Sequence, residues 1–171
     1  MTAGVTASIE FRVKAAQQGA TTDLGTPRAP VDLSFLSQLI PGTDADNKAD
    51  RMYSAEITLT SAQTANLDLA GVLSTGLGVT ITAAEVVAIA LIADAANTTN
   101  IAFFGAASNA FNGPLGGTTP TLTLKPGAAA LLVDPDGWAV TASTGDILSV
   151  VNGSGASATY TVVIIARTSA S

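Results

Sequence analysis

The chain has 171 residues, of which 47% are hydrophobic and only 12% are charged, and its formal net charge is −6 at pH 7. Because an average soluble domain carries about 25% charged residues, we expect much of the surface to be covered in the working state by other copies of the chain. The acidic balance argues against a phosphate-binding or nucleic-acid-binding surface. The sequence has no histidine and no cysteine, which excludes Ser-His-Asp triads, disulfides and the usual zinc sites.

Neither a membrane helix nor a secretion signal is expected. The longest apolar run, residues 86–93, is bracketed by Glu85 and Asp94, whereas a helix needs about 20 apolar residues to cross a bilayer. Residues 1–5 lack a basic region followed by an apolar core. We therefore expect a chain that is made in the cytoplasm and has no membrane partner.

The first predicted element is a strand with one solvated face. Over residues 8–14, apolar and charged side chains alternate, namely Ile9, Phe11 and Val13 with Glu10, Arg12 and Lys14. Residues 17–30 are predicted to be a loop, because glycines and prolines interrupt regular structure there. Residues 31–40 fit either a strand or a short helical turn, and the polar residues 41–50 are expected to be a surface loop.

The middle of the chain predicts further strands separated by loops. Strand-like segments are residues 51–60, 66–69 and 101–104. Residues 85–93 fit a buried strand or a short core helix, and their β-branched side chains favour the strand. Residues 105–119 are predicted to be a long loop rich in glycine, asparagine and serine.

The C-terminal third, residues 120–166, predicts a rapid succession of strands. Residues 134–137, Asp-Pro-Asp-Gly, form the strongest turn signal in the sequence, because proline presets φ and glycine accepts a positive φ. The last run, residues 159–165, is β-branched and aromatic, so we expect a central strand with both faces buried. The whole chain, residues 1–171, is thus predicted to be one all-β domain of about ten strands. We expect a jelly-roll-like β-sandwich with an N-terminal strand or arm and long loops.

Three patterns could carry chemistry, and each has a simpler interpretation. The paired carboxylates Asp134 and Asp136 could serve a glycosidase, but acidic residues are also favoured in turns. Residues 44–50 resemble the start of a calcium loop, yet Lys48 occupies a ligand position and Ala49 replaces the required glycine. Residues 153–158 fit a dinucleotide glycine pattern but precede a strand rather than a helix, so we predict a hairpin loop. We expect no enzyme activity, no metal and no cofactor.

Contacts with other proteins are instead predicted at two loops. Phe111, on the loop 105–119, is interpreted either as an interface anchor or as a side chain packed beneath that loop. The predicted interface residues are Phe111, Asn112 and Pro114 on this loop and Pro27 and Pro30 on the loop 17–30.

Several segments resemble a family of small structural proteins of tailed phages and prophages. The resemblance is carried by residues 106–115, 125–127 and 137–148, and upstream by residues 49–53 and 67–71. It spans most of residues 49–165 and consists of turn and strand positions, so it implies no catalytic residues. Proteins of this kind are typically capsid decoration (cement) proteins or tail components.

The resemblance implies a virion protein that binds the outer capsid and stabilises it. The expected partners are the major capsid protein and further copies of the chain, with a homotrimer favoured, because decoration proteins typically sit at threefold positions. One alternative is a tail tube, baseplate or tip protein. A tube protein should carry a long hairpin, and the sequence gives no obvious sign of one. The other alternative is a carbohydrate-binding β-sandwich module, for which Trp138 and Phe111 are the candidate exposed aromatics.

Overall fold

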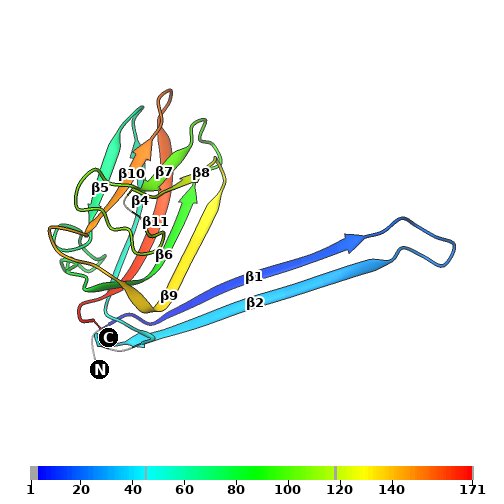
Figure 1. Ribbon diagram of the computed structural model, residues 1–171, viewed down its shortest axis with the longest axis horizontal. Coiled ribbons are helices and arrows are strands. Elements are labelled where there is room, and N and C mark those ends of the chain that lie inside the picture. The colour runs from blue at the N-terminus through cyan, green and yellow to red at the C-terminus, as the bar shows by residue number, and fades with distance from the viewer. Residues whose placement is uncertain (1–3, 45, 118, 171) are drawn as a thin grey trace.

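Two long strands project from the rest of the molecule in the computed structural model, which describes residues 4–44, 46–117 and 119–170 (Figure 1). Strand β1 (Ala7–Gln18) pairs with β2 (Arg28–Pro41) in antiparallel register, from Ala7 opposite Leu39 to Gln18 opposite Arg28. At about 3.4 Å per residue, a twelve-residue strand reaches about 40 Å. We call this hairpin, residues 7–41, the arm.

The arm corrects two expectations for the N-terminal region. The loop predicted for residues 17–30 is shorter, because β1 continues to Gln18 and β2 begins at Arg28. Residues 31–40, for which a strand and a helical turn were both possible, form part of strand β2. Together with β1 they make a long hairpin, of which the sequence gave no obvious sign. A short strand, β3 (Lys48–Ala49), pairs in parallel with the end of β2.

The remaining strands form two four-stranded antiparallel sheets, which we call the body. The long-strand sheet has the order β4-β11-β6-β9, comprising β4 (Arg51–Leu59), β11 (Ala158–Arg167), β6 (Glu85–Ala93) and β9 (Ala129–Ala139). The short-strand sheet has the order β5-β10-β7-β8, comprising β5 (Thr64–Asp68), β10 (Ile147–Asn152), β7 (Ile101–Phe104) and β8 (Thr121–Leu124). The described residues form no helix, and so none that could cross a membrane.

The hydrophobic core lies between these two sheets, as in a β-sandwich. Both sheets contribute to it, with Ile89, Leu91, Tyr160 and Val162 from one and Phe103, Leu148 and Val150 from the other, each almost completely buried. Phe103 meets Tyr160 edge to face across the layers, with ring centroids 5.4 Å apart. The all-β prediction is confirmed, and β11 lies in the interior of its sheet as its sequence predicted.

The predicted turn at residues 134–137 is wrong, because these residues lie within the continuous strand β9. They form a bulge: Ala88 pairs with Val133 and Val86 with Trp138, which leaves four residues of β9 opposite one of β6. Arg167 is buried beside the bulge, where its Nε lies 2.5 Å from Glu85 Oε2 and its guanidinium donates to the Pro135 and Asp136 carbonyls. A Cβ on Gly137, whose φ is 85°, would collide with Glu85.

The predicted hairpin loop near residues 153–158 is also wrong in detail. Strands β10 and β11 flank it but belong to different sheets, so the segment links the two layers instead of closing a hairpin. Asn152 holds this link, because its Nδ2 donates to the carbonyls of Leu59, Thr60 and Ala156 at 2.8–3.2 Å.

Candidate assembly surfaces

The two faces of the arm differ sharply in polarity. Since directly opposed residues of an antiparallel pair share a face, the register places the odd-numbered residues together. That face is apolar, with Ile9, Phe11, Val13, Ala15, Val31, Leu33, Phe35 and Leu39. The other face carries the charges, with Glu10, Arg12, Lys14, Arg28 and Asp32. On it, Arg12 binds Asp32 through two hydrogen bonds, at 2.9 and 2.6 Å.

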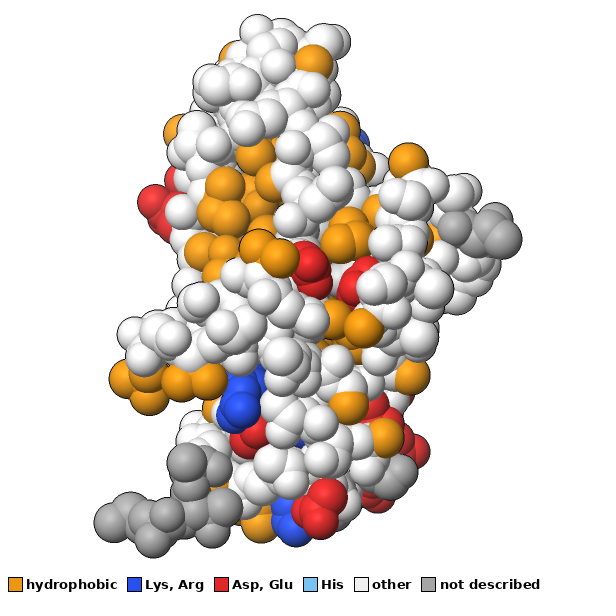
Figure 2. Space-filling view, turned by 90° about the vertical axis from the view of Figure 1, so that its left-hand side faces the viewer, with side chains coloured by type: hydrophobic (Ala, Val, Ile, Leu, Met, Phe, Trp, Pro, Cys, Tyr) orange, Lys and Arg blue, Asp and Glu red, His pale blue; other side chains and the backbone are white. Residues whose placement is uncertain are grey.

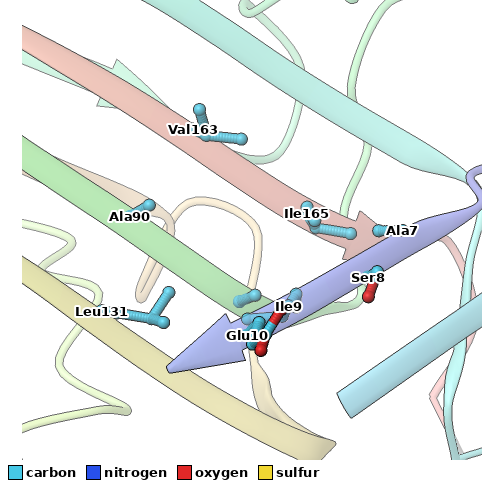
Figure 3. A pocket seen from close by; sticks show the side chains of 9 residues that line it. Ala7, Ser8, Ile9, Glu10, Ala90, Leu131, Val163 and Ile165 are labelled. Atoms are coloured by element: carbon cyan, nitrogen blue, oxygen red, sulfur yellow. The ribbon is translucent and has the colours of Figure 1, made fainter. Parts of the chain in front are cut away.

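Only the base of the apolar face packs against the body. Ile9 and Leu39 are buried against Ala88 of β6 and Ile165 of β11, on the outer side of the long-strand sheet. Figure 3 shows β1 crossing β11 and β6 at this point, beside a pocket of about 290 Å³ that Leu131 and Val163 also line. Beyond it, Phe11 and Phe35 border a second pocket with Leu131 and Val133 of β9.

Further out, the apolar face has no cover within the described chain. Leu33 and Val31 are each 56% exposed, and Phe11 and Phe35 are more than 40% exposed. A two-stranded ribbon is marginally stable in water, and large exposed apolar patches mark contact sites. The arm therefore has the physical properties of a docking element.

The tip of the arm is an ordered turn that presents a leucine to solvent. Thr22 and Gly25 exchange two backbone hydrogen bonds of 2.9 Å, and Leu24 between them is fully exposed. The predicted contact residues Pro27 and Pro30 lie next to this turn and are also exposed. Pro27 is adjacent to Gly19, and Pro30 is opposite Ala16 in the ladder.

The other predicted contact loop, residues 105–119, is anchored to the body. Phe111 is 1% exposed and stacks on Phe104 in the core, so it packs beneath the loop and cannot act as an exposed interface anchor. Asn112 Nδ2 donates to the Gly117 carbonyl at 3.0 Å, and Pro114 is half-buried. The structure thus separates the five predicted interface residues, with the prolines 27 and 30 on the arm and the other three on the body.

A second apolar surface lies at the start of β4. A groove of about 570 Å³ is lined by Val5, Met52, Leu77 and Val79, together with Gly4, Thr6, Asp50, Arg51, Thr75 and Gly76. We call it the β4 groove. Leu77 is 92% exposed on a loop that Thr75 orders through bonds to Val79 and Gly78. Figure 2 shows the side of the molecule away from the arm, where charged side chains are sparse and hydrophobic ones reach the surface in several places.

The acidic residues considered for chemistry form hydrogen bonds and ion pairs within the described chain. Asp134 Oδ1 accepts a hydrogen bond from the Asp136 amide at 3.2 Å, within the bulge of β9. In the acidic loop, Lys48 lies 3.3 Å from Asp44, and Asp50 accepts from the Thr168 amide and hydroxyl. No cluster of three or more potential metal-binding side chains occurs within residues 4–44, 46–117 and 119–170.

The sequence pattern left residues 31–40 undecided between a strand and a helical turn and gave no sign of the β4 groove. A signal for the strand was present, because apolar residues recur at odd positions from Ala29 to Phe35. The groove leaves no comparable signal, because three separate segments build it. Comparisons with protein-family models, with curated proteins and with solved structures find no match.

Proposed function

We propose that this chain is a structural protein of a tailed-phage virion, most simply a capsid decoration protein that binds the outer capsid and stabilises it. The observation that carries the proposal is the arm, which is about 40 Å long, has one apolar and one charged face, and projects past the body beyond its packed base. Such an element is long enough to reach a neighbouring subunit. Its proposed partners are further copies of the chain, in a trimer, and the major capsid protein.

The strand pairing of the body supports the same proposal. The pairs β4–β11, β5–β10, β6–β9 and β7–β8 are nested one inside the other along the chain. Nested pairs divided between two sheets are what a folded-over, eight-stranded jelly roll requires, and jelly rolls are common in viral capsid domains. We therefore propose a jelly-roll body, as the sequence led us to expect.

A tail component is the second candidate, and the hairpin specifically favours it. A long hairpin is the feature expected of a tube protein that stacks in rings, and the arm supplies one. The carbohydrate-binding alternative is less well supported, because Phe111 lies in the core and Trp138 is partly buried against it, beside Gly113.

Particles from the source culture provide the test. Mass spectrometry of gradient-purified virions should detect the chain in many copies per particle, and antibody-gold labelling should decorate the heads. Labelling confined to tails would favour the second candidate over decoration. Absence of the chain from purified virions, in a culture whose lysate contains it, would contradict both.

A further inference from the structure

The projecting part of the arm and the β4 groove lie at opposite edges of the long-strand sheet. Strands β4 and β9 are its two edge strands, and the groove adjoins the start of β4. The arm begins near β4, crosses β11 and β6, passes Val133 of β9 and projects beyond that edge. When the β9 edge of one copy faces the β4 edge of another, the first copy's arm is directed at the second copy's groove.

We infer that the β4 groove binds the apolar face of the arm of a second copy, so that copies join head to tail. This inference rests on the proposed function, because it requires the arm to drive self-assembly. Both surfaces are apolar: Val31 and Leu33 are exposed on the arm, and Leu77, Val79 and Met52 are exposed in the groove. Their contact removes from water the two sets of large apolar side chains that the folded chain leaves uncovered at these sites.

The distribution of charge favours this pairing over contact between bodies. Three acidic and three basic side chains balance within residues 7–41, so the formal net charge of −6 belongs to the rest of the chain. Two bodies repel each other, whereas a neutral arm approaches an acidic body without that penalty. Electrostatic repulsion therefore opposes contact of the groove with a second groove more than contact with an arm.

The size of the contact favours a closed ring. Even the full ribbon, about 40 Å long and about 10 Å wide, has a footprint of at most roughly 400 Å², or roughly 800 Å² summed over both partners, and the packed base reduces it further. This area is below the roughly 1,200–2,000 Å² of a standard interface. In a ring, each copy donates one arm and receives another, so it forms two such contacts. Because the two surfaces differ, the contact is heterologous, and such contacts form a ring when the rotation between copies closes and an open filament when it does not. A ring lets every copy make both contacts.

Introduced cysteines test the contact directly, because the chain contains none of its own. Two differently tagged chains are co-expressed, one carrying Leu33→Cys and the other Leu77→Cys, and the purified protein is oxidised. We expect a disulfide-linked pair containing both tags. Ser34→Cys is the matched control, since its side chain lies on the arm's polar face, and it should give no such pair with Leu77→Cys.

A second measurement uses substitutions on one exposed loop. Leu77→Asp should raise the concentration at which the assembly dissociates by about tenfold or more, whereas Val72→Asp should not, because Val72 is 72% exposed but does not line the groove. If Leu33→Cys instead crosslinks to Ile92→Cys and not to Leu77→Cys, the β4 groove is not the binding site of the arm. Assembly driven by the arm would still stand in that case. An oligomer that forms none of these crosslinks would also contradict binding of the arm in the β4 groove. A monomeric wild-type chain would overturn the self-assembly in the proposed function as well.

Discussion

Tyr160 is a buried side chain whose ionisation is coupled to folding. Burial, with a smaller effect from Tyr53, raises its pKa from 10.0 to about 12. Since the folded chain holds the phenolic proton more tightly than the unfolded chain, the stabilisation is complete below pH 10 and is lost as the pH rises through 12. We expect the free energy of unfolding to fall by about 1.4 kcal/mol per pH unit over that window, as measured by urea unfolding.

The variant Tyr160→Phe isolates this effect. The phenolic oxygen is buried and has no hydrogen-bond partner among the described residues, so its removal should change stability at neutral pH by less than about 1 kcal/mol. The variant should lose the part of the alkaline dependence that Tyr160 contributes. An unchanged slope between pH 10 and pH 12 would assign that dependence to other groups.

Two of the arginine–carboxylate pairs, the buried Arg167–Glu85 and the exposed Arg12–Asp32, should respond differently to mutation. Arg167 is completely buried and holds Glu85 and the β9 bulge, so Arg167→Met should destabilise the fold by about 3–5 kcal/mol. Arg12→Met removes the pair with Asp32 on the solvated face of the arm and should change thermal stability little. Equal losses in the two variants, measured by thermal unfolding, would contradict this difference.

Phe111 illustrates what the sequence could not decide at a single residue. A phenylalanine in a loop of glycine and asparagine is equally consistent with an exposed anchor and with a buried contact. Its burial depends on Phe104, at the end of β7, and on a backbone hydrogen bond from its amide to the carbonyl of Ile147. Ile147 lies on β10, far from the loop in the sequence.

At the scale of elements, the alternation of residues 8–14 correctly predicted β1, but Pro30 concealed the start of β2, where the sequence predicted a loop. Proline cannot donate to a ladder and is tolerated only at edges. In the two-stranded arm both strands are edge strands, so Pro30 fits within β2 opposite Ala16. At residues 134–137 the sequence predicted a turn where the structure has a strand. These residues form a bulge within β9, because Arg167, far along the chain, donates to the carbonyls of Pro135 and Asp136.

Two leucines on the same face of the arm should separate folding from assembly. Leu39 is 1% exposed at the base, so Leu39→Ala should cost about 2–5 kcal/mol of stability. Leu33 is half exposed on the projecting part, so Leu33→Ala should leave the unfolding midpoint of the dilute chain almost unchanged and weaken self-association. Denaturant unfolding and sedimentation of both variants check this, and a destabilised Leu33→Ala that associates normally would contradict it.

At the scale of the whole molecule, the sequence predicted one all-β chain but not its strand order. The local sequence pattern indicates which segments are strands. It does not indicate which strands pair, and the pairs join segments as distant in sequence as β4 and β11, where Arg51 lies opposite Ala166. Such pairings depend on closing long loops and on complementary packing between sheets. The projection of the arm likewise follows from where its base packs on the long-strand sheet.

The measurement that tests the central claim most directly is the solution mass of the wild-type chain and of the double variant Leu33→Ser and Phe35→Ser, by light scattering after size exclusion. We expect the wild type to form a closed oligomer, with a trimer near three times 16.9 kDa, and the variant to be a folded monomer with an unchanged circular dichroism spectrum. A wild type that stays monomeric at all concentrations, or a variant that assembles equally well, would contradict the claim that the arm joins copies of the chain.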